Sequence, residues 1–242
     1  MDISINGDLL RLQEEWLDQF HVSEFAEKYS LSRPFSYAVT SQYVESPKRI
    51  MIVGQESKDF GPFGGGWPLP AIQEFNIQYT DRQLCRVESG YRYNPSPFWN
   101  MFRYMNQNGV TPAWNNVDKL HRIIGGKTVP LSAEVERILS GPYGNDRRTL
   151  LQREIELTKP NGVYFITGPN YSETMSLALG IDQSLLVEHK PVPSCLCQNI
   201  TEIAQIGVPV FWSYHPRYLQ MQKAMAEVAN SIITTLHDQS AV

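Results

Sequence analysis

The fold of this chain is decided by the stretch Arg49-Ile50-Met51-Ile52-Val53-Gly54-Gln55-Glu56-Ser57-Lys58-Asp59. Its run of apolar and β-branched residues follows Ser46-Pro47 and indicates a buried strand. We expect the backbone to turn at Gly54, because glycine has no Cβ that opposes a turn. The polar residues beyond it would then lie at the carboxyl end of a strand, where open α/β sheets bind ligands. The alternative is a strand followed by an ordinary solvated loop.

Further strands and helices alternate along the chain. Apolar runs predict strands at 163–168, 185–187 and 208–212, and a strand bearing two asparagines at 114–119. Helical spacing predicts N-terminal helices at 8–32, helices at 98–105, 150–157 and 172–179, and a last helix that buries Tyr218, Met221, Met225, Val228 and Ile232. This pattern predicts a single α/β domain over 1–242, with a mostly parallel sheet flanked by helices and an irregular insertion near 125–148.

The composition is that of a globular protein. With 242 residues and 42% hydrophobic content, the chain can bury a sizeable core. Its apolar runs are too short for a membrane span, and its start lacks the pattern of a leader peptide, so we expect a cytoplasmic monomer with no membrane partner. The formal net charge of −4 argues against a nucleic-acid coat protein. It leaves room for a nucleic-acid enzyme, which needs only a local basic surface.

The cysteines favour neither disulfides nor a metal site. Cys85, Cys195 and Cys197 are an odd set without the spacing of a disulfide framework, which fits a reducing compartment. A metal site that includes His189 is conceivable, but zinc and iron–sulfur ligand pairs usually lie about two to four residues apart. We therefore expect buried or incidental thiols and no metal.

A segment rich in glycine and aromatic residues follows the decisive strand. Glycines and prolines in 60–70 predict a long shaped loop, and its Phe63 and Trp67 form a candidate stacking platform beside the polar cluster. The glycines could also cradle a phosphate, which would suit a phosphate-binding or nucleotide-hydrolysing enzyme. However, the loop lacks the Gly-Lys-Ser/Thr ending of a P-loop.

Three short motifs resemble those of a known family. Gly54-Gln55-Glu56 and His215-Pro216-Arg217 each follow a predicted strand, and Asn115-Asn116 lies on a strand between them. This order resembles the uracil-DNA glycosylase superfamily, in which a strand ends in Gly-Gln-Asp-Pro-Tyr or a variant, a later strand bears a base-reading Asn, and a late strand ends in His-Pro-Ser. The helix and strand at 150–168 are also similar, so the resemblance covers roughly residues 49 to 220.

The resemblance implies a monofunctional DNA glycosylase that needs no cofactor and leaves an abasic site. Glu56 stands in the place of the water-activating Asp, Gln55 lines the pocket after Gly54, His215 faces the departing base, and Asn115 or Asn116 reads the base. The chemistry fits these residue types. A carboxylate stabilises the positive charge that develops on the sugar and positions water, and a histidine stabilises the negative charge on the leaving base.

The departures from the family pattern imply a larger base than uracil. Ser57-Lys58 replaces Pro-Tyr, so the aromatic gate against 5-substituted pyrimidines is missing, and Gly64-Gly65-Gly66 brings no side chains to fill the space. We expect Lys58 to contact a modified pyrimidine with a bulky, hydroxyl-bearing substituent, as in phage genomes, in a setting of DNA repair or anti-phage defence. In the competing possibility, Trp67 or Phe63 folds back and closes the pocket.

The expected partner is DNA that contains a modified or damaged base. Flipping a nucleotide requires a stacking residue and a wedge, and Tyr218 or Leu219 is the candidate wedge. Arg147, Arg148 and Arg217 are predicted phosphate contacts. The alternative class of function is a non-catalytic nucleotide or nucleic-acid binding module that uses the same pocket.

Overall fold

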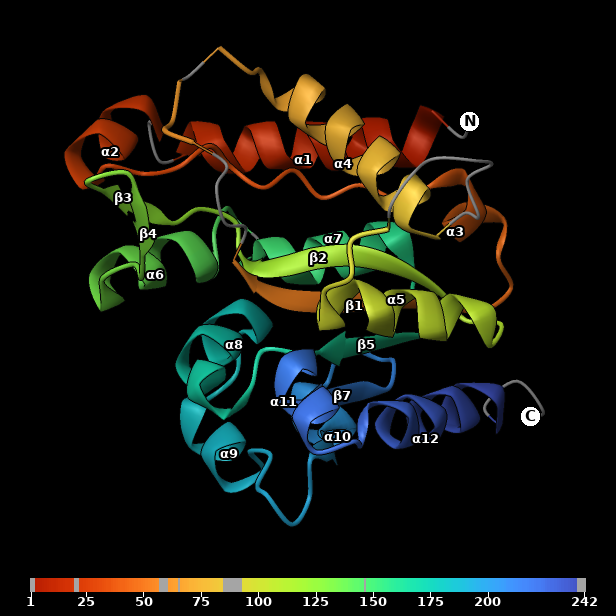
Figure 1. Cartoon of the computed structure of the whole chain (residues 1–242). Coiled ribbons are helices and arrows are strands. Elements are labelled where there is room, and N and C mark those ends of the chain that lie inside the picture. The colour runs from red at the N-terminus through yellow and green to blue at the C-terminus, as the bar shows by residue number, and fades with distance from the viewer. Residues whose placement is uncertain are drawn as a thin grey trace.

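A computed structural model of the chain describes residues 3–19, 22–56, 61–64, 66–84, 93–145 and 147–238, without the side chains at positions 3, 22, 23 and 56. The main feature of this part of the chain is a five-stranded sheet in the order β2-β1-β5-β7-β6, with helices on both faces (Figure 1). Its strands are β1 (Arg49–Glu56), β2 (Thr111–Asp118), β5 (Gly162–Phe165), β6 (Cys197–Asn199) and β7 (Val210–Ser213). β6 pairs antiparallel with β7, and the other pairings are parallel. The predicted α/β fold with a mostly parallel sheet is confirmed.

The two faces of the sheet pack into separate hydrophobic clusters because successive side chains of a strand point to opposite faces. Met51 and Val53 face one side, where they meet α1 (Ile3–Gln19), α7 (Leu150–Thr158), α8 (Ser172–Leu179), α9 (Gln183–Glu188) and α10 (Thr201–Ala204). Ile50 and Ile52 face the other side, with α4 (Leu69–Leu84), α5 (Pro97–Gln107), α11 (Pro216–Met221) and α12 (Met225–Asp238). Burial on both faces explains why β1 reads as an unbroken apolar run.

The remaining elements lie around this frame. They are α2 (Val22–Tyr29), α3 (Ser41–Glu45), the hairpin of β3 (Arg122–Ile124) and β4 (Lys127–Val129), α6 (Ala133–Ser140) and the 3-10 turn η1 (Pro169–Tyr171). α1 and α6 contribute to a third hydrophobic cluster, in which the Nε1 of Trp16 donates to the carbonyl of Leu139 at 3.2 Å. Among the described residues, no helix is long and apolar enough to cross a membrane.

Local signals explain several helix boundaries. Ser96 caps α5 by accepting a hydrogen bond from the backbone N–H of Trp99, and Pro97 occupies the first turn. α7 begins with a capping box between Thr149 and Gln152. It ends at Lys159, which adopts a left-handed conformation with φ of 44°.

The prediction of a strand at 185–187 is wrong. These residues lie in α9, which is capped by the side chain of Asp182. Leu186 is buried, whereas Leu185 is 46% exposed and Val187 is 43% exposed, so only one of the three faces the core. A short apolar run cannot distinguish a strand from a turn of helix. The antiparallel edge strand β6 was not predicted, and it occupies the other side of β7.

The predicted last helix is two helices. α11 ends at Met221, and Lys223 has a positive φ of 56° before α12 begins at Met225. Met221 is therefore 71% exposed, contrary to the prediction that it is buried, while Val228 and Ile232 lie in the core as predicted.

Three other boundaries also differ from expectation. The N-terminal helices begin at Ile3 and end at Tyr29 in place of the predicted 8–32. The irregular insertion near 125–148 holds the β3–β4 hairpin as well as the expected short helix, α6. The glycine-rich segment passes directly into α4, a helix whose many polar residues hid it from the hydrophobic pattern.

Candidate active site at the carboxyl edge of the sheet

The parallel strands bring the predicted motifs to one edge of the sheet. Strand β1 lies between β2 and β5, and in its register Gly54 pairs with Asn116 and Glu56 pairs with Asp118. The segments that follow β5 and β7 start at this same edge. In Figure 1 it faces the side of the molecule where α6, α8 and the β3–β4 hairpin lie. This is the position where open α/β sheets bind ligands.

Gly54 has a different role from the one predicted. The chain does not turn there, because β1 continues in extended conformation to Glu56. A Cβ at this position would lie 2.8 Å from the Oδ1 of Asn116 and 3.1 Å from the Cε2 of Phe98. Glycine is therefore needed so that the Asn116 side chain can lie against the backbone of β1.

The end of β5 connects the β1 motif to the β7 motif. The Nε2 of Gln55 donates to the carbonyl oxygen of Thr167 at 2.7 Å. The next residue, Gly168, has a positive φ of 80° and donates its N–H to the carbonyl of Ser213 at 3.0 Å. A Cβ on Gly168 would lie 3.7 Å from the backbone nitrogen of His215, so a single dipeptide touches both motifs.

His215 is the N-cap of α11. Its Nδ1 accepts a hydrogen bond from the backbone N–H of Arg217 at 3.2 Å, and its ring is partly exposed. An imidazole nitrogen that accepts a hydrogen bond is unprotonated, so in the neutral ring the proton is on Nε2. In the neutral ring the hydrogen-bond donor of His215 is therefore its Nε2–H.

The two adjacent asparagines face opposite sides of the sheet. Asn115 is fully buried on the α7 side, where its Nδ2 donates to Glu154 Oε2 at 2.9 Å and its Oδ1 accepts from the backbone N–H of Asn116 at 2.8 Å. Asn116 points to the α5 side, where its Oδ1 accepts from the Nε1 of Trp114 at 3.2 Å. Asn115 is therefore part of a core network, and Asn116 is the one beside Gly54.

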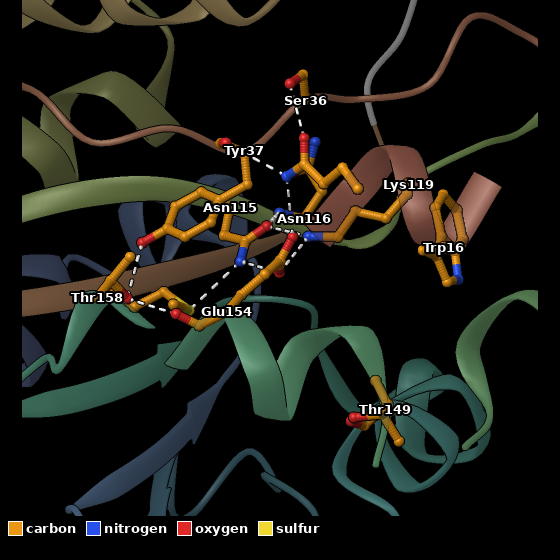
Figure 2. Close-up of polar contacts among 12 residues, drawn as sticks. Trp16, Ser36, Tyr37, Asn115, Asn116, Lys119, Thr149, Glu154 and Thr158 are labelled. Carbon is orange, nitrogen blue, oxygen red and sulfur yellow. Dashed lines mark hydrogen bonds and ion pairs between the residues drawn. The ribbon is translucent and has the colours of Figure 1, made fainter. Parts of the chain in front are cut away.

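Figure 2 shows the core network that Asn115 joins. Lys119 and Glu154 form an ion pair of 2.8 Å with side chains only 5% and 0% exposed, and Lys119 also donates to the Oδ1 of Asn115. The Nε2 of Gln13 in α1 donates to the other carboxylate oxygen at 3.2 Å. Burial lowers the pKa of Lys119, and the charge of Glu154 opposes that shift. The network joins α1, β2 and α7 directly behind the candidate site.

A cavity of about 280 Å³ opens at this edge, between the segments that follow the two neighbours of β1. β2 and the chain beyond it contribute Asp118, His121, Thr128, Val129, Pro130, Leu131 and Glu136, and the segment after β5 contributes Asn170, Tyr171 and Thr174. The hydroxyl of Thr174 donates to Glu136 Oε1. Burial, and then the neighbouring Glu173, raise the pKa of Glu136. The cavity therefore offers carboxyl, amide and hydroxyl groups to a ligand.

Some predicted site residues lie elsewhere or outside the described residues. The side chain of Glu56 and all of Lys58 are outside the described part of the chain. Phe63 packs partly buried beside α1 and α2, and Trp67 is 51% exposed before α4. The stacking platform therefore stays a prediction.

The predicted DNA contacts have mixed surroundings. Leu219 is fully buried in the core under α11, so it cannot serve as an inserted wedge, and that prediction is corrected. Tyr218 is partly exposed and stacks on Tyr214 with ring centroids 4.3 Å apart. Arg147 and Arg217 are exposed, and Arg148 forms a surface ion pair with Glu156.

Sequence reasoning missed the residues that line the cavity. Asp118 stands two positions after Asn116 on the same strand, and Asn170 and Tyr171 follow Thr167-Gly168. The rule that located Gln55 also applies to them, since each set comes just beyond a buried parallel strand. Glu136 gave no such signal, because it lies in α6, far from any predicted strand end.

Among the described residues, no group of three or more His, Cys, Asp or Glu side chains could hold a metal ion. Cys195 is exposed and Cys197 is half-buried. Burial raises the pKa of Cys197 to about 12, so this thiol is protonated at neutral pH. Cys85 lies outside the described residues.

Comparison with known proteins does not assign the chain to a family. No protein-family model matches the sequence, and no curated protein matches it. The chemistry of the site therefore rests on its own residues.

Proposed function

We propose that the protein is a monofunctional DNA glycosylase that hydrolyses the N-glycosidic bond of a flipped, modified pyrimidine and leaves an abasic site. One observation carries the proposal. Three motifs that resemble the uracil-DNA glycosylase superfamily, around Gln55, Asn116 and His215, are far apart in sequence and meet at one edge of one sheet.

The residues at this edge suit the reaction. Breaking the bond leaves positive charge on the sugar, which the carboxylate of Glu56 stabilises while it positions water. The Nε2–H of His215 donates to the base oxygen that gains negative charge. The amide of Asn116 reads the base, because it lies beside Gly54, whereas Asn115 belongs to the core network on the opposite face of the sheet.

The cavity beside β1 suits the substituent of a modified base. Asp118 pairs in register with Glu56, so the cavity begins beside the end of the strand that carries the proposed catalytic residue. Hydroxyl groups both donate and accept hydrogen bonds, and Asn170 and Thr174 offer both kinds of partner. The raised pKa of Glu136 lets its carboxyl donate as well as accept over a wider pH range. Lys58 adds a cation after β1. A hydroxyl-bearing 5-substituent fits this set better than a bare uracil.

This activity would serve DNA repair or defence against phage with modified genomes, in the cytoplasm and as a monomer. No cofactor is required, because water is the only co-reactant of the hydrolysis.

The test is the formation of abasic sites in oligonucleotides. Wild-type protein is incubated with strands that contain uracil, 5-hydroxymethylated pyrimidines or glucosylated pyrimidines, and cleavage is then measured after alkali treatment. Glu56→Gln should stop base release while its melting temperature stays unchanged. Glu227→Gln, at an exposed position in the first turn of α12, is the matched control and should keep full activity.

Two outcomes would contradict the proposal. Base release by a folded Glu56→Gln variant at the wild-type rate would remove that residue from the mechanism. Tight binding of a modified strand without any abasic site would identify a nucleic-acid binding module that uses the same pocket.

A further inference from the structure

Two aromatic side chains are exposed side by side on the surface at α4. Trp67 is 51% exposed and Phe75 is 41% exposed, and their ring centroids lie 5.8 Å apart in an edge-to-face arrangement. A single exposed aromatic residue is ordinary, but adjacent ones mark interaction surfaces.

The exposed pair continues inward to the candidate active site. Phe75 stacks on Tyr79 with centroids 5.7 Å apart, and Tyr79 lies 6.2 Å from Trp114 of β2. The Nε1 of Trp114 in turn donates to Asn116 Oδ1 at 3.2 Å. We call Trp67, Phe75, Tyr79 and Trp114 the aromatic row. It forms a continuous path from the surface to the amide proposed to read the base.

Two arginines, Arg33 and Arg82, lie near residues of the aromatic row. The guanidinium of Arg33 lies 5.7 Å from the Trp67 ring centroid. On α4, Phe75, Tyr79 and the exposed Arg82 are spaced i, i+4 and i+7, which places them on one helix face.

Two acids of α4, with Gln78 between them, occupy a neighbouring stripe. Glu74, Gln78 and Asp81 have the same i, i+4, i+7 spacing but start one residue earlier, and the Nε2 of Gln78 donates to Glu74 Oε1 at 2.8 Å. A polyanion along the exposed face of α4 therefore has Arg33 beside Trp67, Arg82 about one helical turn beyond Tyr79, and Glu74 and Asp81 to one side.

We propose that the aromatic row binds single-stranded DNA by stacking unpaired bases on Trp67 and Phe75. Every base has a π-face, so aromatic platforms bind single strands with little sequence preference, and arginines hold the backbone. The bases of a duplex are already stacked on one another and cannot use such a platform. The inference deepens the proposed function, because it names a single strand as the substrate class that leads to Asn116.

The direct test is fluorescence anisotropy with an unmodified labelled strand and with the same sequence as a duplex. Trp67→Ala and Phe75→Ala should each weaken single-strand binding about tenfold, and the double variant should bind more weakly than either single variant. Phe75→Tyr, which keeps the ring, should bind as the wild type does. Arg82→Ala should flatten the salt dependence of single-strand binding.

Controls separate stacking from a loss of folding. Leu185→Ala removes an equally exposed apolar side chain, 46% exposed on α9, and should change the affinity less than twofold. All variants should keep the wild-type melting temperature, and duplex affinity should change less than twofold.

Unchanged single-strand affinity in the folded double variant would overturn the inference, and so would an equal loss on duplex. The inference would also be overturned if the wild type is a dimer, the double variant is a monomer, and single-strand affinity is unchanged. The aromatic row would then be a contact between copies of the chain. If the wild type binds single strands through the row but releases no base, the inference stands and the glycosylase proposal fails. If the wild type and the double variant release bases at equal rates at limiting protein, the glycosylase proposal stands and the inference about the aromatic row fails.

Discussion

The buried ion pair of Lys119 and Glu154 contributes to the stability of the fold beside the candidate site, and mutation of either partner measures that contribution. Lys119→Met keeps the length of the side chain and removes its charge. The carboxylate of Glu154 would then be buried with two neutral amide donors, Asn115 Nδ2 at 2.9 Å and Gln13 Nε2 at 3.2 Å. Breaking a buried pair in this way costs about 3–5 kcal/mol. For a chain of this size that corresponds to a fall of roughly 10 °C in the melting temperature.

The second half of the prediction concerns both partners. Lys119→Met/Glu154→Gln removes both charges and keeps an amide oxygen that can accept from Asn115 or Gln13. We expect this double variant to be more stable than either single variant, with a coupling energy of about 2–3 kcal/mol. Urea unfolding followed by tryptophan fluorescence gives the four free energies of unfolding that this cycle needs.

The pH dependence supplies an internal check. In Lys119→Met the carboxylate of Glu154 is buried without its cation, so protonation of this group would remove an unfavourable buried charge from the folded variant. Its stability must then rise as the pH falls, and the gap to the wild type should narrow between about pH 7 and pH 5. A cost below about 1 kcal/mol for Lys119→Met, or single costs that simply add in the double variant, would refute this reasoning.

Three further predictions concern the edge of the sheet. Gly54→Ala places a Cβ 2.8 Å from Asn116 Oδ1 and 3.1 Å from Phe98, so it should cost roughly 1–3 kcal/mol; an unchanged urea midpoint would mean that both neighbours move freely. Glu136→Gln removes a carboxyl whose pKa burial raises, and such a group lowers stability as the pH rises above its ordinary value of 4.5. Calorimetry should therefore show a higher melting temperature than the wild type near pH 7.5 and an equal one near pH 4, and the opposite order would contradict this. His215→Ala should slow the release of poor leaving bases more than good ones in single-turnover assays, whereas equal slowing would indicate only the loss of the α11 cap.

The central strands could be predicted because each is an apolar run bounded by proline or glycine. β1, β5 and β7 are buried on both faces, so hydrophobicity alone reveals them. β6 could not be found in this way, since Cys197–Asn199 is a three-residue edge strand with no apolar pattern. The run at 185–187 misled for the opposite reason, because apolar residues on a short helix can be left exposed.

Only the site residues that follow directly from the ends of the parallel strands could be predicted. The positions of Gln55, Asn116 and His215 at one edge follow from a parallel sheet. Which asparagine lies beside Gly54 depends on which side of β2 each one faces, and the core network of Asn115 depends on the presence of Glu154 and Lys119 on one of those sides. Such partners come from distant elements, and no local pattern indicates them.

The most direct test of the central claim is a single-turnover measurement of base release from oligonucleotides that carry uracil or a hydroxyl-bearing 5-substituted pyrimidine in the same sequence. The proposed mechanism predicts abasic sites from the wild type, formed faster with the larger substituent, and a loss of at least about a hundredfold in folded Glu56→Gln. The absence of abasic sites with every base, or an equal rate in Glu56→Gln, would contradict it.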